Sequence, residues 1–251
     1  MTMKHTATEP SEDRGVSEVI AFILVFAIIL GSIGLLYVVG FDSMQSYQEN
    51  EQLSNAERAM DALADNFNDV ARYDGIESRS GELSARGGTV RVGGESTNIT
   101  ITDGNGDPIE LEQSGIELED LELGALRYES GGDTISYEGG GVFRGHEDHN
   151  GSVTLSEPML QCGTSSAIIT LVVIDADGER SLTADGLVEI DVDQVNATRE
   201  TTTVDGNKVS ISVSEDSPNE MAWNRSIDTA GFEDCDVDTV SIHLVTIEVD
   251  F

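Results

Sequence analysis

The stretch Val19–Phe41, VIAFILVFAIILGSIGLLYVVGF, contains no charged residue over 23 positions. At about 1.5 Å per residue, a helix of this length reaches the roughly 30 Å thickness of a bilayer's hydrocarbon core. A buried core helix is the alternative, but such helices rarely run beyond two turns without a polar face. The chain has no second apolar run of this length. The stretch therefore predicts that the chain crosses a membrane once, and Gly31 and Gly34 give the span a small-residue patch that permits close helix approach.

Basic residues flank the apolar stretch unequally. Lys4 and Arg14 precede it, and the first basic residue after it is Arg58. The positive-inside rule places the basic flank in the cytoplasm. A removable secretory signal is not expected, because its apolar core is only about 7–15 residues long and a small-residue cleavage site follows it. We therefore expect a single-pass protein of the cell membrane in contact with lipid, with a cytoplasmic N-terminus and an extracellular domain over residues 42–251.

A short motif, Asp13-Arg14-Gly15-Val16-Ser17-Glu18, lies directly before the span. Its basic-glycine pair resembles the class III signal of archaeal type IV pilin-like and archaellin-like proteins. The resemblance implies that a prepilin peptidase cuts the leader 1–15 after Gly15, that Arg14, Gly15 and Val16 form the processing site, and that the apolar helix then associates with other pilin-like subunits. Many haloarchaeal pilins have proline where this chain has Glu18. An ordinary basic flank on an uncleaved signal anchor remains the alternative.

A helical pattern continues beyond Phe41. Apolar residues recur at spacings of three and four, the rhythm of a buried helix face: Leu53, Ala56, Met60, Leu63, Phe67 and Val70. Neither Gly nor Pro interrupts residues 41–74, and Gly75 is a plausible helix stop. We expect a transmembrane helix over 16–41 and an extracytoplasmic amphipathic helix over 42–75. The apolar face packs either against the chain's own β domain or against another helix in a coiled coil.

The stretch 55–66, NAERAMDALADN, is similar to one in a family of uncharacterised haloarchaeal membrane proteins with a pilin-like N-terminus. The resemblance covers residues 13–93 and extends more faintly through 126–129 to 141–144. It implies location and architecture and brings no known activity.

From Glu82 onward, short alternating runs separated by Gly, Asp, Asn and Ser predict about ten strands and no helix. Asp103-Gly104-Asn105-Gly106, Asp177-Gly178 and Asp205-Gly206-Asn207 are expected hairpin turns. The run 168–174 is apolar on both faces and predicts a central strand. The expected fold class is α+β: a long N-terminal helix, transmembrane and then amphipathic, followed by an antiparallel all-β sandwich over 76–251.

The chain carries 48 acidic residues against 13 Lys and Arg, a formal net charge of −35. Such an excess repels nucleic acid and anionic membrane surfaces, so we expect no nucleic-acid partner. Loss of lysine with surplus acid is the solubility strategy of halophiles. At about 1 M salt the Debye length is about 3 Å, so self-repulsion is screened. The composition therefore predicts a protein adapted to concentrated salt.

The sequence suggests two kinds of covalent modification on the C-terminal side of the span. Four Asn-x-Ser/Thr sequons predict surface N-glycosylation at Asn98, Asn150, Asn196 and Asn224. The only cysteines, Cys162 and Cys235, form an even pair in a predicted extracytoplasmic domain. They either form a disulfide or remain two buried thiols.

No motif supports catalysis. His146-Glu147-Asp148-His149 lies among residues typical of a loop and lacks a third supporting element for zinc, so a solvated acidic loop is expected. The stretch 103–107 departs from the calcium-loop pattern, with Ser114 at the twelfth position. We therefore expect no catalytic residue, metal or cofactor. Two functions remain: a pilin-like structural subunit displaying a β domain, or a signal-anchored surface binding or adhesion protein that is neither processed nor polymerised.

Overall fold

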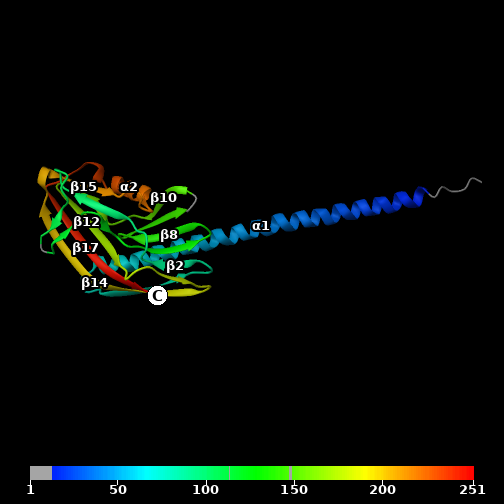
Figure 1. Ribbon diagram of the computed structural model, residues 1–251, viewed down its shortest axis with the longest axis horizontal. Helices are drawn as coiled ribbons and strands as arrows, with labels where there is room; N and C mark the ends of the chain where they lie inside the picture. Colours follow the sequence, from blue (N-terminus) through cyan, green and yellow to red (C-terminus); the bar gives the residue numbers. More distant parts are fainter. Residues whose placement is uncertain (1–12, 113, 147–148) are drawn as a thin grey trace, which may run out of the picture. The chain divides into compact units, whose positions relative to one another are not determined.

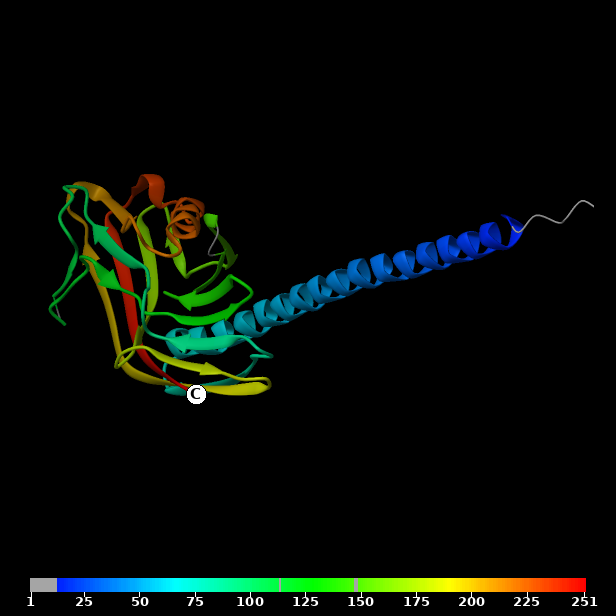
Figure 2. The same ribbon diagram turned by 45° about the vertical axis from the view of Figure 1, so that its right-hand side comes forward.

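The computed structural model describes residues 13–112, 114–146 and 149–251, without the side chains of residues 13–16, 39–50, 149 and 150. The chain divides into two compact units, Met1–Asn50 and Glu51–Phe251. Each unit is described by itself. Helix α1 (Asp13–Arg72) contributes to both, and Figures 1 and 2 show the ribbon from two directions.

In the first unit, α1 contains one segment that is long and apolar enough to cross a membrane, Ser17–Val38. Its mean hydropathy is 3.0 and none of it is buried. The observed segment matches the apolar stretch that the sequence predicts as a span.

In the second unit, the last third of α1 is part of the hydrophobic core. Its apolar face is buried at Ala56, Met60, Leu63, Ala64, Phe67, Val70 and Ala71. This face packs on strands of the same chain, so of the two alternatives the structure supports packing on the β domain. The helix ends at Arg72, and Gly75 follows with a φ of 91°, as expected of a helix stop.

A five-stranded sheet forms the middle of this unit, in the order β1 (Ser78–Ser84), β14 (Leu187–Thr203), β17 (Thr239–Asp250), β12 (Ser166–Asp175), β11 (Leu160–Cys162). Figure 1 shows β14, β17 and β12 side by side. The central pair β12–β17 is parallel, from Ser166↔Thr239 to Asp175↔Glu248. The prediction of a wholly antiparallel domain was wrong at this pair, because the long connection between the two strands allows either direction.

A six-stranded antiparallel sheet has the order β10 (His149–Ser156), β9 (Gly141–His146), β8 (Asp133–Glu138), β7 (Leu126–Ser130), β2 (Thr89–Val92), β13 (Arg180–Thr183). Gly139 and Gly140 form the two-residue turn between β8 and β9, with φ values of 59° and 95°. Two successive positive φ angles are the requirement of a type I′ hairpin, which glycine meets at least cost.

Smaller elements complete the unit. A four-stranded sheet has the order β16 (Cys235–Asp236), β15 (Lys208–Val213), β3 (Asn98–Thr102), β6 (Leu121–Glu122), and β4 (Glu110–Leu111) pairs with β5 (Ile116–Glu117). Helix α2 (Glu220–Thr229) packs against β10, and two short 3-10 helices cover Asp205–Asn207 (η1) and Phe232–Asp234 (η2). The expectation of no helix beyond Glu82 was therefore wrong.

Two hydrophobic cores lie on opposite faces of the five-stranded sheet. The α1 core joins α1 to the five- and six-stranded sheets, and the α2 core joins α2 to the five- and four-stranded sheets. Strand β17 supplies alternate residues to each core: Val240, Ile242 and Leu244 to the α2 core, then Val245, Ile247 and Val249 to the α1 core. Successive side chains of a strand point to opposite faces, so the covered face changes between Leu244 and Val245.

The same change of face occurs in β12, where Ala167, Ile169 and Leu171 lie in the α2 core and Val172 and Ile174 in the α1 core. This change of covered face explains why residues 168–174 are apolar on both faces of the strand. The domain is mostly antiparallel β structure, but both helices fill cores, which differs from the all-β sandwich predicted.

Of the three predicted hairpin turns, one reverses a strand locally. Thr102 bridges Pro108 across Asp103–Gly106, and the Asp103 carboxylate accepts hydrogen bonds from the amides of Asn105 and Asp107 at 2.9 and 3.0 Å. By contrast, Asp177-Gly178 and Asp205-Gly206-Asn207 connect strands of different sheets. The prediction of hairpins there was wrong, because turn residues fix a change of direction and not the sheet that the next strand joins.

Candidate functional site

The apolar segment of α1 presents an uncovered hydrophobic surface within the described part of the chain. Its large apolar side chains are 50–72% exposed, including Val19 at 59%. Burying one such side chain is worth about 1.5–3 kcal/mol, so an aqueous environment for the whole segment is strongly unfavourable. The segment is therefore a candidate membrane anchor or signal sequence.

Glycines leave part of this helix surface open. A Cβ atom added to Gly31 or Gly34 meets nothing within 4 Å. Another helix can thus approach the backbone at these two positions without displacing a neighbouring atom of the same chain. Phe41 has a helical backbone, and its side chain lies outside the described atoms.

The predicted processing segment lies at the start of α1. The backbone of Arg14, Gly15 and Val16 is helical, and the helix begins at Asp13, three residues before the expected start at Val16. Their side chains lie outside the described atoms. Cleavage after Gly15 stays a prediction.

The histidine cluster lies at the connection between β9 and β10. His146 pairs with His149 across this connection, and Glu147 and Asp148 lie outside the described residues. Among the residues that the structure describes, no group of three or more His, Cys, Asp and Glu side chains is arranged to hold a metal ion.

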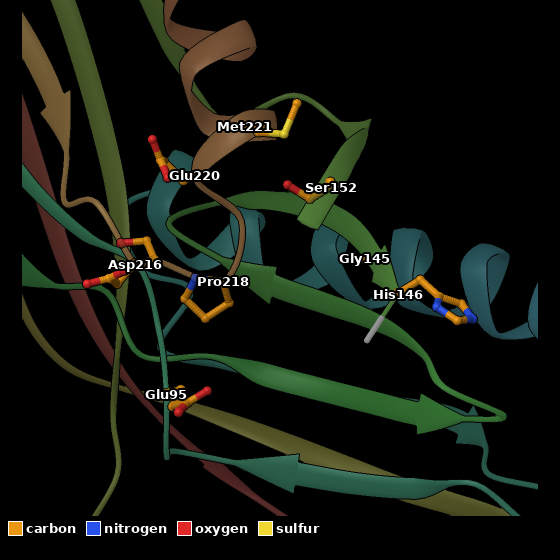
Figure 3. A pocket seen from close by; sticks show the side chains of 10 residues that line it. Glu95, Gly145, His146, Ser152, Asp216, Pro218, Glu220 and Met221 are labelled. Carbon is orange, nitrogen blue, oxygen red and sulfur yellow. The ribbon is translucent and has the colours of Figure 1, made fainter. Parts of the chain in front are cut away.

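A groove of about 480 Å³ lies beside this connection (Figure 3). Its walls come from the β9–β10 hairpin, the loop 216–218, the first residues of α2 and Glu95. Figure 3 shows the side chains of Glu95, Glu220 and His146 on different sides of the groove, with no common point toward which they converge. Acidic and polar side chains predominate in its lining, among them Glu95, Asp216 and Glu220.

A buried carboxylate lies next to this groove. Glu138 is 1% exposed and lines an adjoining pocket of about 280 Å³. It accepts hydrogen bonds from the Thr97 hydroxyl at 2.7 Å and amide at 3.3 Å, and from Asn219 Nδ2 and Trp223 Nε1 at 2.9 Å each. These donors come from the residue before β3, the residue before α2 and α2 itself. Because both carboxylate oxygens accept hydrogen bonds, Glu138 is a structural junction that joins β8 to the start of β3 and to α2.

Two groups with a shifted pKa lie outside the groove. Burial raises the pKa of Tyr137, whose hydroxyl donates to Asn68 Oδ1 at 3.0 Å in the α1 core. Burial, and then the nearby Arg199, lower the pKa of His243 on the five-stranded sheet. Neither Tyr137 nor His243 lines the groove. The groove therefore offers none of these shifted groups as an acid or base.

The two cysteines join different sheets. Cys162, in edge strand β11, and Cys235, in β16, form a disulfide with Cα atoms 5.8 Å apart. The bond closes a sequence separation of 73 residues. It ties the five-stranded sheet to the four-stranded sheet at the border of the α2 core.

The predicted glycosylation sites lie in three different settings. Asn98 is in β3, Asn196 in β14 and Asn224 in α2, whereas the side chain of Asn150 is outside the described atoms. Asn196 and Asn224 are exposed, and Asn98 is half-buried. The sequence shows the motifs, but it does not show these differences in exposure.

Comparison with known proteins gives one match. A family model described as "Family of unknown function (DUF7289)" matches residues 14–251. No curated protein and no solved structure matches. The match includes the apolar segment and the whole of the second unit.

Proposed function

The chain belongs to the DUF7289 family, and we propose that it is a single-span cell-envelope protein, a type IV pilin-like structural subunit that displays its β domain outside the cell. The observation that carries the proposal is the uncovered apolar segment Ser17–Val38 within a helix whose last third is buried in the β domain. One helix thus supplies both the membrane segment and part of the domain's core.

The flanking residues support the orientation and the processing. Lys4 and Arg14 precede the span closely, whereas the first basic residue after it is Arg58, and this asymmetry of the flanks favours a cytoplasmic N-terminus. The Arg14-Gly15 pair next to the span is the feature on which a prepilin peptidase would act. After cleavage, Val16 would begin the mature chain, and the open helix surface at Gly31 and Gly34 would favour contact with the helices of other subunits.

A specific observation favours a second function. The acidic groove of about 480 Å³ lies on the β domain, away from the membrane segment in sequence, and a surface-bound partner could occupy it. In that case the chain would be an uncleaved, signal-anchored binding or adhesion protein. Both functions share the outward β domain and differ in the processing of the leader.

The outward topology is tested with a single reactive cysteine. Both native cysteines are in the disulfide, so Ser181→Cys, at an exposed position of β13, introduces the one free thiol. In intact cells, a membrane-impermeant maleimide should label this variant and leave the unchanged chain unlabelled. Labelling only after lysis would contradict the topology. Alkaline carbonate should leave the protein in the membrane fraction, since an integral helix is not extracted by it.

A further inference from the structure

We propose that Asn196 carries an N-linked glycan, and that Asn98 and Asn224 do not, because among the three sequons whose asparagine side chains the structure describes, the one at Asn196 alone leaves both of its groups accessible. The inference rests on the outward topology proposed above. It distinguishes between sites that are equivalent in sequence.

A sequon offers two groups to a glycan-transferring enzyme, the asparagine carboxamide and the hydroxyl two residues later. At Asn196 both are accessible. Asn196 is exposed, Thr198 is half-buried, and neither side chain forms a hydrogen bond or ion pair with the described residues. Since residues i and i+2 of a strand share a face, the carboxamide and the hydroxyl lie on the same side of β14.

The backbone around Asn196 is also open. Pairing of β1 with β14 ends at Ser78↔Asp193, so beyond this point β14 pairs only with β17 among the described strands. A bulge lies between Gln194 and Asn196, and the bulged Val195 is 56% exposed. A segment paired on one edge and interrupted by a bulge is easier to reach than one paired on both edges.

The sequon at Asn98 is engaged in the four-stranded sheet. The Asn98 carboxamide donates to Asp120 Oδ1 at 3.0 Å, and the Thr100 hydroxyl accepts from the Asp120 amide at 3.0 Å. Strand β3 is paired with β15 on one edge and β6 on the other. Both groups of this sequon are therefore used within the fold.

The two groups of the sequon at Asn224 lie on different faces of helix α2. Asn224 is exposed, but Ser226 is 2% exposed, and its hydroxyl is hydrogen-bonded to the Thr154 hydroxyl at 3.0 Å. In a helix, residues i and i+2 do not share a face. The carboxamide therefore points to solvent while the hydroxyl lies against β10.

The reaction needs a lipid-linked sugar phosphate as donor. The Asn196 Nδ2 attacks the anomeric carbon of the sugar, so that an N–C bond forms as the C–O bond to the phosphate breaks. The lipid phosphate leaves with the bonding electron pair, and Nδ2 releases one proton. The attached glycan would cover Val195 and the open edge of β14, which blocks pairing with an edge strand of another molecule.

Tryptic mapping separates the four sequons. Cleavage after Arg and Lys places Asn98, Asn150, Asn196 and Asn224 on four different peptides, 92–127, 145–180, 181–199 and 209–225. In full-length protein isolated from its native membrane, we expect glycan mass on peptide 181–199 and only unmodified peptides 92–127 and 209–225. An unmodified peptide 181–199, or glycan on either of the other two, would overturn the proposal.

Matched variants show that the glycan depends on the sequon and not on the strand. Asn196→Gln and Thr198→Ala should lose the glycan mass from peptide 181–199, whereas Thr198→Ser, which keeps the hydroxyl, should retain it. Asn98→Gln and Asn224→Gln should leave the glycan mass unchanged. Trp223 fluorescence checks that each variant is folded. If Ser181→Cys is labelled from outside but peptide 181–199 is unmodified, the topology holds and the glycan proposal fails. If the thiol is protected, the proposed function itself fails.

Discussion

Replacing Phe67 by alanine should destabilise the β domain, although Phe67 lies in the helix and not in a sheet. Phe67 is 0% exposed, and its ring meets Tyr137 edge-on, with centroids 5.2 Å apart and an interplanar angle of 80°. Truncation of a buried phenylalanine costs about 3–5 kcal/mol, and alanine's better helix propensity returns only about 0.5 kcal/mol. The free energy of unfolding should therefore fall by about 3–4 kcal/mol, a large part of the roughly 5–15 kcal/mol that stabilises a typical domain.

The loss is measured by urea unfolding of the full chain in detergent at high salt. The single tryptophan, Trp223, is fully buried in the α2 core and reports on the core that does not contain Phe67. Circular dichroism follows the sheets at the same time. With a slope of about 2 kcal/mol per molar urea, the midpoint should fall by about 1.5–2 M in both signals.

Asp61→Ala provides the control on the same helix. Asp61 is exposed, so its replacement should change the free energy of unfolding by less than about 0.5 kcal/mol. If Phe67→Ala shifted the midpoint no more than Asp61→Ala does, the helix would not be part of the core. A midpoint shift that depends on protein concentration would instead indicate a coiled coil between chains.

Three further outcomes are expected. The double variant Cys162→Ser/Cys235→Ser should have a free energy of unfolding that is about 4 kcal/mol lower, since the disulfide closes a long loop. A reducing agent should lower the melting temperature of the unchanged chain but not that of the double variant. Glu138→Leu should lower the free energy of unfolding by about 2–4 kcal/mol and shift Trp223 emission to the red, because the buried donors of Thr97, Asn219 and Trp223 would lose the oxygen that accepts their hydrogen bonds; unchanged emission would contradict the junction role. Lowering salt from about 1 M to about 0.1 M should reduce the melting temperature, because the Debye length rises from about 3 to about 10 Å at a net charge of −35; a rise would contradict the halophilic interpretation.

Helix α1 was the most predictable part of the fold. The apolar run indicated the uncovered apolar segment of the helix, and the spacing of Leu53 to Val70 indicated its buried face. Periodicity identifies a face but not what covers it, so the choice between the β domain and a second chain required the structure. Residues 16–41 and 42–75 were predicted as two helical regions, and in the structure both belong to the one helix Asp13–Arg72 except for the last three residues.

Helix α2 was missed although its start carries a signal. Ser217-Pro218-Asn219 directly precedes Glu220, a combination typical of helix N-termini. The helix has only ten residues, and four of them are buried, so its apolar periodicity is weak. The two cores were also beyond prediction, because alternation along β12 and β17 does not show which face is covered.

The groove and its buried junction could not be predicted from sequence. Nothing in the sequence distinguishes Glu138 from the other acidic residues of a chain that has 48 of them. Its hydrogen-bond donors lie 41, 81 and 85 residues away along the chain. Only the tertiary fold brings a carboxylate and these donors together.

The mature N-terminus tests the central claim most directly. Full-length protein is purified from the membrane fraction, and its terminal peptide is identified by mass spectrometry, alongside Gly15→Val as a variant that blocks the processing site. We expect the unchanged chain to begin at Val16 and the variant to retain residues 1–15. An unchanged chain that retains residues 1–15 would contradict a processed pilin-like subunit and leave an anchored surface protein.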